Sequence, residues 1–406
     1  MLILIFVLVY VGMLLGGIPG LNVDRTGVAL LGAILLIVLG MVTPERAVDH
    51  LDVSTLALLF SMMVLSAQLR LGGFYTAVVR RFALAGHAPG MLLAIVIVVA
   101  GALSAVFTND VIALAIAPVL LAVCRARALP PLPFLVALAC ATNVGSAATL
   151  IGNPQNMLIG ETLGLDFARY ASIALLPTVL GLFIVWGVIY TLDRKRLAAP
   201  SDASAPSLPP AAVGPALDRW QAGKGLGLAA VLLLAFFFTG WPRAIVALAV
   251  AGVVLLSRRF HTRDMLGLVD WQLLVLFAGL FIVNGALLDS GRVAGAEQWL
   301  GAQGVAVRDP AVLYLLAPLL SIMVSNVPAV MLLLPVAAHP LAGPALALSS
   351  TLAGNALIIG SIANIIVVEQ SARAGFTITW RDHARLGLPI TILSLAVAGA
   401  ALLLFN

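Results

Sequence analysis

Charged residues are scarce in this chain, and their scarcity decides its class. Only 10% of the 406 residues are Asp, Glu, Lys or Arg, whereas soluble domains carry about 25%. Hydrophobic residues make up 62% of the sequence. This composition excludes an ordinary soluble enzyme and a disordered protein. The net charge of +5 does not indicate nucleic-acid binding, because the 22 Lys and Arg residues are scattered between long apolar runs.

Cysteine is also scarce. Cys124 and Cys140 are the only two, and both lie in apolar surroundings, so the sequence has neither a disulfide framework nor the spacing of a metal site. It also lacks a glycine-rich phosphate loop of the Walker type. We therefore expect no cofactor and no ATP hydrolysis within this chain, although the sequence leaves open an ATPase partner on another chain.

What the sequence has in abundance is apolar segments near the 20 residues that cross a bilayer. They are continuous rather than alternating, which favours helices over an outer-membrane barrel. The first, Leu2–Ile18, has no basic residues ahead of it and reads as a retained helix rather than a signal peptide. The prediction is an all-α polytopic membrane protein of a bacterial-type inner membrane, with the lipid bilayer as its surroundings.

The two halves of the chain resemble each other. Thr108-Asn109 and Ser325-Asn326 are each followed by a proline at the same distance, and Ile151–Asn156 resembles Ile359–Asn364. We therefore predict an internal repeat of about five transmembrane helices in each half. The predicted units are a first repeat (1–197, with a hairpin at 90–124 and a broken helix at 134–160), a linker (198–218) and a second repeat (219–406, with a hairpin at 310–341 and a broken helix at 345–369).

An odd number of crossings in each half inverts the second half relative to the first, a plan common in secondary transporters. With the 193–224 region in the cytoplasm, 17 of the 22 Lys and Arg residues fall on the cytoplasmic side. This asymmetry fits the positive-inside rule and predicts both termini outside. The prediction that the hairpins are re-entrant rests on length, because Val111–Cys124 and Ala329–Ala338 are short for full spans.

Polar residues inside a membrane are costly and mark functional sites. Here they form four clusters, two at the hairpin tips and two where glycines or Pro154 interrupt a helix. Broken helices meeting near the midplane direct helix ends and free carbonyls at one point, which is the basis of a substrate or ion site. The candidate binding residues are Thr108, Asn109, Asp110, Asn143, Gly145, Gly152, Asn153, Asn156, Ser325, Asn326, Gly354, Asn355, Ser361 and Asn364.

Asp110 is the only acidic residue at either predicted hairpin tip. A buried carboxylate there could bind a proton or a cation, and an Asp at that position also suits the start of a helix. The two interpretations are compatible, and we predict that Asp110 couples transport to protons. Asp52 and Asp270 read as helix caps, and Glu369 reads as a solvated partner of Arg373.

The segments Phe107–Asp110 and Ala141–Asn156 resemble the ion transporter superfamily, and within it the arsenite-permease and citrate-transporter-like group. That group includes plant silicon-efflux transporters and bacterial putative anion transporters. Ser325–Pro328 and Thr351–Asn364 are similar to the second-half motifs, so the resemblance covers nearly the whole chain. It implies an inverted repeat with two re-entrant hairpins and two broken helices, a homodimer, and a transport domain that moves against a scaffold.

By position, the resemblance implies two half-sites. Thr108, Asn109, Gly145 and Gly152 would line the first, and Ser325, Asn326, Gly354 and Asn364 the second. The coupling ion would be a proton, or sodium at the hairpin tips. Sodium-coupled dicarboxylate members resemble one another in a Ser-Asn-Thr triplet at both tips, from which Asp110 and Val327 depart.

An ionised Asp110 would repel a dianion, and the four clusters contain no Lys or Arg to offset it. We therefore predict a secondary transporter of a small inorganic solute or anion, with arsenite efflux by proton antiport through Asp110 as its sharpest form. A sodium-coupled carboxylate symporter and a sodium/proton antiporter are the alternatives. A channel lacks coupling, and an intramembrane enzyme would need more titratable groups than Asp110 alone.

Overall fold

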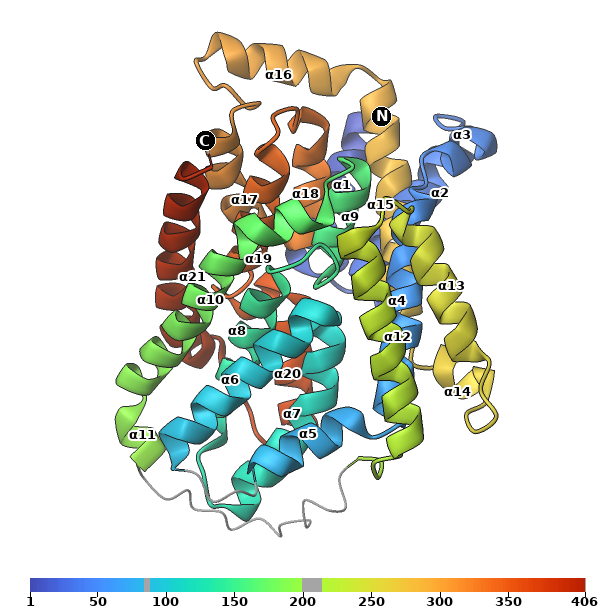
Figure 1. The fold of residues 1–406 in the computed structure, drawn as a ribbon. Helices are drawn as coiled ribbons and strands as arrows, with labels where there is room; N and C mark the ends of the chain where they lie inside the picture. The colour runs from blue at the N-terminus through green and yellow to red at the C-terminus, as the bar shows by residue number, and fades with distance from the viewer. Residues whose placement is uncertain (84–87, 199–213, 406) are drawn as a thin grey trace.

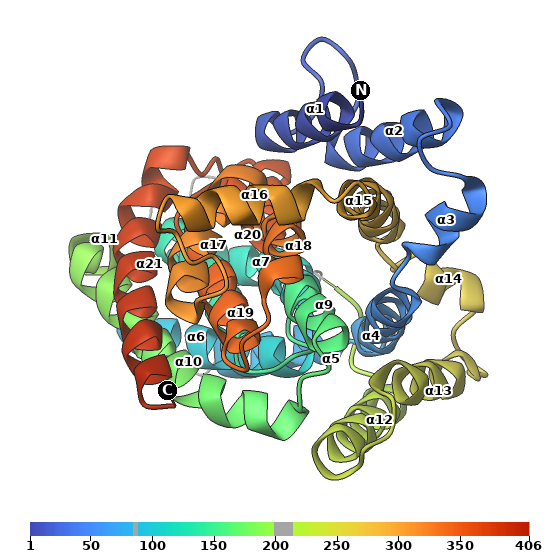
Figure 2. The same ribbon diagram turned by 90° about the horizontal axis from the view of Figure 1, so that it is seen from above.

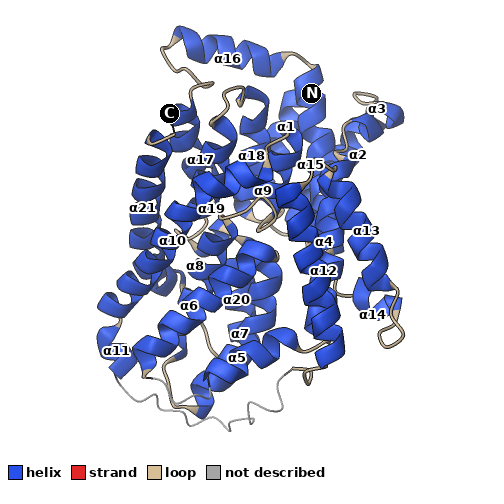
Figure 3. Cartoon of the chain, viewed as in Figure 1, coloured by secondary structure: helices blue, strands red, loops and turns tan. Residues whose placement is uncertain are grey.

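The protein is described by a computed structural model that covers residues 1–83, 88–198 and 214–405, and these residues form helices joined by loops (Figures 1 and 3). They form 21 α-helices, two short 3-10 helices and no strand. The all-α prediction is therefore confirmed. Most of the predicted linker, residues 199–213, lies outside the described residues.

The chain order of the helices is as follows. The part before the linker contains α1 (Leu2–Leu15), α2 (Arg25–Val38), α3 (Pro44–Asp49), α4 (Val53–Leu71), α5 (Phe74–Ala83), α6 (Pro89–Val106), α7 (Asn109–Ala126), α8 (Pro131–Ser146), α9 (Pro154–Thr162), α10 (Phe167–Leu192) and α11 (Arg194–Ala198). The part after it contains α12 (Arg219–Phe238), α13 (Arg243–Leu255), α14 (Thr262–Leu266), α15 (Trp271–Asp289), α16 (Arg292–Ala302), α17 (Pro310–Val324), α18 (Asn326–Leu333), α19 (Ala342–Ala353), α20 (Ile362–Arg373) and α21 (Trp380–Leu403), with η2 (Leu334–Val336) after α18 and η3 (Ile358–Gly360) before α20.

Seven of the described helices are long and apolar enough to cross a bilayer. They are α4, α6, α7, α10, α12, α15 and α21. Several shorter helices, including α1 and α2, are equally apolar and expose large aliphatic side chains such as Leu4 and Leu8. Exposed aliphatic faces of this extent suit a hydrocarbon environment, because in water they would promote aggregation.

The helices fall into two groups when the molecule is seen from above (Figure 2). Helices α1–α4 and α12–α15 form a curved row, which we call the arc. Helices α5–α11 and α16–α21 form a compact cluster, which we call the bundle. The helices at the centre of the bundle are the most buried, since every residue of α8 from Leu132 to Ser146 is inaccessible to solvent or nearly so.

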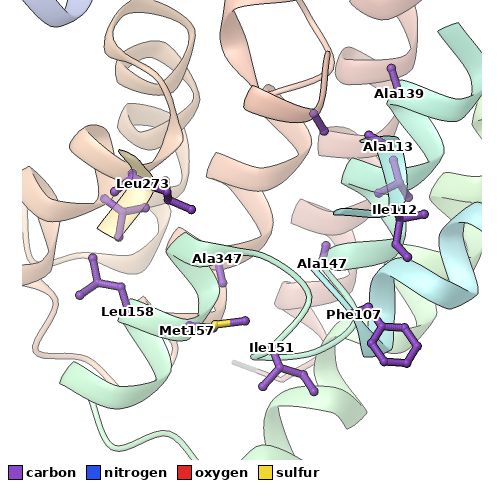
Figure 4. Close-up of a cluster of buried hydrophobic side chains, with 14 of the residues drawn as sticks. Phe107, Ile112, Ala113, Ala139, Ala147, Ile151, Met157, Leu158, Leu273 and Ala347 are labelled. Carbon is purple, nitrogen blue, oxygen red and sulfur yellow. The ribbon is translucent and has the colours of Figure 1, made fainter. Parts of the chain in front are cut away.

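Two helices of the bundle are interrupted near its centre. After α8, an irregular segment (147–153) precedes α9, and Asn153 caps α9 by accepting a hydrogen bond from the Asn156 amide at 2.8 Å. Pro154 occupies the first turn of α9, where its missing N–H costs nothing. The break between α19 and α20 has the same form, with Ser361 as the cap of α20. Buried apolar side chains from α7, α9 and α19 gather around the first interruption (Figure 4).

The two predicted hairpins correspond to the helix pairs α6/α7 and α17/α18, which lie toward opposite ends of the molecule (Figure 1). The length argument is wrong for Val111–Cys124, because α7 extends over 18 residues and is itself long enough to span. It holds better for α18, which has only eight residues before the chain continues as η2. Asn109 and Asp110, which the sequence predicts at a hairpin tip, belong to the first turn of α7 and lengthen it.

Candidate functional site

The two helix interruptions meet at Asn143, whose side chain lies at the centre of a buried network of amides. The Asn143 amide nitrogen donates to the side-chain oxygens of Asn355 (3.1 Å) and Asn364 (3.0 Å). Its oxygen accepts from the Ser361 hydroxyl at 2.8 Å and from the Asn109 amide at 3.0 Å. One residue of α8 therefore joins the first hairpin to the interruption of the second half.

Thr351 makes the reverse connection from α19. Its hydroxyl oxygen accepts from the amides of Asn153 and Gln155, both at 3.2 Å, and lies 3.2 Å from the Asn156 side-chain oxygen, to which it can donate. Thr351 lies 208 positions after Asn143. The predicted residues Asn143, Asn153, Asn156, Asn355 and Asn364 are thus brought together, and Thr351 and Gln155 are members that the sequence reading missed.

The backbone carbonyls freed by the interruptions are bound by two asparagines. Asn156 donates to the Thr149 carbonyl at 3.1 Å, and Asn364 donates to the carbonyls of Gly354 (2.7 Å) and Leu357 (3.0 Å). Unwound backbone at membrane depth persists only where such partners exist. These two amides are therefore largely occupied in holding the fold, which leaves them little capacity for a solute.

Two aromatic side chains complete the network from outside the predicted clusters. The Tyr170 hydroxyl donates to the Ala147 carbonyl at 2.8 Å, and His383 Nε2 lies 3.0 Å from the Asn355 carbonyl oxygen. His383 is buried within α21. The mixed polar and apolar sequence of residues 370–385 would suit the membrane interface, but the structure buries His383. The sequence feature that could have indicated its burial is the apolar helix that begins directly after Thr379.

Gly145 and Gly152 serve close backbone packing. A Cβ atom on Gly145 would lie 2.2 Å from the Gly101 carbonyl oxygen, and one on Gly152 would lie 2.2 Å from the Ser146 carbonyl oxygen. The Gly152 carbonyl also accepts from the Asn109 backbone amide at 2.9 Å. These glycines let α6 and the first hairpin approach the α8 interruption, as Gly354 lets Asn326 approach the second.

At the α17/α18 junction, Ser325 has a left-handed backbone conformation (φ 75°) that only glycine adopts readily. The next residue, Asn326, satisfies all its polar atoms when its amide is oriented to donate to the carbonyls of Ser350 and Gly360 at 3.0 Å. In that orientation its oxygen accepts from Gln155. The second hairpin is therefore bonded to residues of both halves, whereas Asn109 of the first hairpin bonds to Asn143 and Gly152 of its own half.

Asp110 lies apart from this network. Its half-buried side chain lines a cavity of about 50 Å³ on the boundary between the arc and the bundle. The cavity lining, beside Asp110, comprises Met63, Ala67, Arg70, Thr108, Val111, Leu114, Pro154, Leu268, Asp270, Leu273 and Ile366. The sequence placed Asp110 and Asn109 in one cluster, but successive residues of a helix point in directions about 100° apart. Here one side chain faces the network and the other faces the cavity.

Two charged residues of this cavity come from segments that the sequence reading left out of the site. Arg70 belongs to the last turn of α4, and Asp270 caps α15 by accepting from the Leu273 amide at 3.0 Å. The capping role predicted for Asp270 is confirmed, as is that of Asp52 on α4. The four sequence clusters do lack Lys and Arg, but the argument against a carboxylate substrate is weakened, because Arg70 reaches the cavity from elsewhere.

Thr108 also lines the cavity, and its side chain is only 2% exposed. Its hydroxyl has no hydrogen-bond partner among the described residues. A buried hydroxyl without a partner is costly, so it marks a position where a ligand atom would be stabilised. In the same residues, no group of three His, Cys, Asp or Glu side chains is arranged to hold a metal ion.

A partly buried ion pair joins the arc to the bundle at the C-terminal end of α9. Arg243, at the start of α13, donates to Glu161 at 2.7 Å and to the carbonyls of Leu165 (2.8 Å) and Gly160 (2.7 Å). The Arg243 and Glu161 side chains are 14% and 12% exposed. A guanidinium with three such partners fixes the C-terminal end of α9 against the arc.

Comparison with known proteins gives similarities to a family, to two relatives and to a solved structure. The sequence model of a family described as citrate transporter, CitMHS, matches residues 4–345. An uncharacterized transporter of Mycobacterium tuberculosis is 31% identical, with 93% of this chain and 92% of the relative covered. The silicon efflux transporter of Oryza sativa is 27% identical, with 94% and 92% covered. In addition, the crystal structure of the YdaH transporter of Alcanivorax borkumensis has the same fold, with a TM-score of 0.60, 16% identity, and coverage of 98% of this chain and 96% of that one.

Proposed function

This chain belongs to the citrate transporter family, as its resemblance predicted, and is an integral membrane transporter rather than an enzyme; on that premise, we propose that it moves a small inorganic solute or its anion in exchange for, or together with, protons bound by Asp110. Arsenite and related oxyacids are the leading class. The silicon efflux transporter of Oryza sativa, a relative named for an element whose acid is a weak oxyacid, supports this choice.

The observation that carries the proposal is the position of Asp110. This carboxylate lines a cavity on the boundary between the arc and the bundle. Its neighbour Asn109 is bonded through its side chain to Asn143 and through its backbone to the Gly152 carbonyl. A change in the charge of Asp110 therefore occurs next to Asn109, whose hydrogen bonds belong to the central network. Coupling requires such a connection between the site that binds the proton and the part of the protein that moves.

We propose that transport occurs by alternating access, with the bundle moving against the arc. The matched roles of Asn143 and Thr351, and of Asn156 and Asn364, support an inverted repeat of residues 1–197 and 219–406, because both pairs are separated by 208 positions. Re-entrant hairpins, a homodimer, an inner-membrane location, external termini and a cytoplasmic linker belong to the same proposal. Inverted repeats and broken helices at the substrate site are general features of secondary transporters.

A sodium-coupled carboxylate symporter is the second candidate. Arg70 favours it, because a guanidinium in the cavity can bind a carboxylate with two hydrogen bonds. The description of the family as citrate transporters favours it as well. On this alternative, sodium would bind at the hairpin tips near Asn109 and Asn326.

The test is internal pH in proteoliposomes of the purified protein, in sodium-free buffer, under an imposed arsenite gradient. Asp110→Asn runs beside the wild type, and Asp49→Asn, an exposed carboxylate on α3, is the matched control. We expect a proton flux that follows the arsenite gradient, persists in Asp49→Asn and is lost in Asp110→Asn.

Two results would overturn the proposal. A flux that survives in Asp110→Asn would remove this residue from the coupling. A flat pH trace, from liposomes in which the same protein accumulates citrate when sodium is added, would replace the oxyacid–proton reading with the carboxylate–sodium one.

A further inference from the structure

We propose that Arg70 is the anion-binding residue of the cavity, and that the Asp110 carboxylate and the solute anion compete for its guanidinium. This inference rests on the proposed function and deepens it by naming the charge of the bound solute and the direction of coupling.

Arg70 has the position and the freedom that an anion site needs. It is half-buried at the end of an apolar helix and lines the cavity together with Asp110 and Asp270. Among the ion pairs within 4.0 Å between described residues, none includes Arg70, whereas Arg243, Arg259 and Arg385 each pair with an acid. A guanidinium held in a membrane protein without an ion-pair partner is expensive. An anionic ligand would supply that partner.

Other groups at the cavity are also suited to an anion. The Thr108 hydroxyl, buried and without a partner, can donate to a ligand oxygen. Thr108 precedes the first turn of α7 and Pro154 forms the first turn of α9, so the N-terminal ends of two helices border the same cavity. Helix N-termini carry partial positive charge and stabilise anions.

The charge balance of the cavity then sets the direction of coupling. With both acids ionised, Arg70, Asp110 and Asp270 together carry one negative charge, which opposes the entry of an anion. If Asp110 takes up a proton as a monoanion binds Arg70, the net charge of the cavity is unchanged. A weak oxyacid can supply both parts: its O–H bond breaks, the proton passes to the Asp110 carboxylate, and the conjugate anion pairs with Arg70.

The helices packed against α7 bring few other charges to this position. α6 contains no charged or histidine residue, and the one titratable residue of α8 is Cys140. On α20, Glu369 and Arg373 form an exposed pair with each other at the far end of the helix. On α5 the titratable groups are Tyr75, Arg80 and Arg81. On α4, Arg70 is the charged residue that lines the cavity, and the acids that line it with Arg70 are Asp110 and Asp270.

Competition between Asp110 and the anion predicts that proton and anion bind together and move in the same direction. A neutral solute that hydrogen-bonds to the ionised Asp110 carboxylate would instead exclude the proton and give antiport. The two modes are distinguished by the effect of pH on affinity. Binding of a constant-charge anion strengthens as pH falls in the first mode, and binding of a neutral acid weakens in the second.

The experiment is ligand binding to the detergent-purified full chain, measured by calorimetry and by the shift in melting temperature at pH 6 and pH 8. The probes are acetate and sulfate, whose charges are nearly constant over this range, citrate, and arsenite as an acid that is neutral throughout. The variants are Arg70→Gln, Arg70→Lys and Asp110→Asn. Arg259→Gln, which removes an exposed guanidinium paired with Asp218, is the matched control.

For the wild type, we expect at least one anionic probe to bind at least tenfold more tightly at pH 6 than at pH 8. Arg70→Gln should weaken that binding at least tenfold at both pH values, and Arg70→Lys should restore part of it. Asp110→Asn should bind at pH 8 as the wild type does at pH 6. A ligand-free melting temperature close to the wild-type value, together with the partial rescue by Lys, separates loss of the site from misfolding.

The inference is overturned if no anionic probe binds, if Arg70→Gln binds as tightly as Arg259→Gln, or if Asp110→Asn keeps the wild-type pH dependence. These failures differ from failure of the proposed function. Arsenite-driven proton flux that persists in Arg70→Gln would remove this inference alone. Arg70-dependent anion binding in a protein that carries no proton flux would remove proton coupling alone.

Discussion

The side chains of Asn143 and Thr351 lie 208 positions apart in the chain, and each binds the helix interruption of the opposite half. Asn143 holds Asn364 at 3.0 Å, and Thr351 holds Asn153 and Asn156 at 3.2 Å. Among the described residues, neither side chain forms a hydrogen bond to the interruption of its own half. The two halves are therefore joined at the centre of the protein by two sets of hydrogen bonds, one from Asn143 and one from Thr351. The contribution of each set to stability can be tested separately.

We expect Asn143→Ala to destabilise the protein more than Thr351→Val. Removing the Asn143 amide leaves the side-chain nitrogen of Asn109 and the side-chain oxygens of Asn355 and Asn364 without a partner, and each such buried group costs about 1–3 kcal/mol. The measurement is the melting temperature in detergent. Thr351→Ser, which keeps the hydroxyl, should stay closer to the wild type than Thr351→Val, and equal losses in the two Thr351 variants would contradict a hydrogen-bonding role.

The partly buried pair between Glu161 and Arg243 should contribute strongly to the contact between arc and bundle. Arg243→Gln leaves a partly buried carboxylate unpaired and removes two bonds to carbonyls, so we expect a loss of about 2–3 kcal/mol, visible as a clear drop in melting temperature. Arg308→Gln, which removes the mostly exposed partner of Glu297, is the control and should change stability by about 0–1 kcal/mol. Equal effects of the two substitutions would show that the Glu161 pair does not fasten the groups.

A single methyl group at Gly145 should disrupt the contact between α6 and α8. The added Cβ would lie 2.2 Å from the Gly101 carbonyl oxygen, and neither backbone can move without disturbing the interruption that follows. We expect Gly145→Ala to abolish recovery of folded protein. Gly223→Ala, whose Cβ would meet nothing within 4 Å, should be neutral or stabilising by about 0.5–1 kcal/mol. Recovery of Gly145→Ala at the wild-type level by size-exclusion chromatography would refute the close packing.

Ser325 should be strained for a side-chain residue. With φ at 75° and ψ at 162°, it occupies a region that is essentially confined to glycine and costs about 1–3 kcal/mol. Ser325→Gly should therefore melt at a higher temperature than Ser325→Ala, which also loses the hydroxyl but keeps the strain. Comparing the transport rates of these two variants then isolates what the strain contributes to function. If Ser325→Gly melts below Ser325→Ala, the conformation is not strained.

Much of the fold could be predicted from the sequence because the bilayer imposes length and apolarity on each span. The interruptions were predictable for a second reason. Pro154 cannot continue a helix, and asparagines inside apolar segments need polar partners. These rules act within one segment, so they identify which residues lie at a break. They do not identify the partner across the break, which depends on how distant helices pack.

The parts of the site that sequence reasoning missed are those supplied by packing. Arg70 ends an ordinary apolar helix, and nothing near it in sequence indicates that it borders the same cavity as Asp110. His383 follows Trp380 and Asp382 in a segment that looks interfacial, but the helix turns it inward. For Asn109 and Asp110, the prediction joined two residues that the structure separates. They are neighbours in sequence, but in the helix Asn109 faces the amide network and Asp110 faces the cavity.

The reciprocal fastening of the two halves also constrains how the protein is made. Asn143 leaves the ribosome long before Asn364, its partner 221 residues later. During that interval, the amides of the first interruption must bind water or another chain, because hydrocarbon offers them nothing. The first half therefore cannot settle fully into lipid on its own, and a truncated chain ending at residue 197 should be retained by the insertion machinery or degraded. The order of synthesis makes the second half a folding partner of the first.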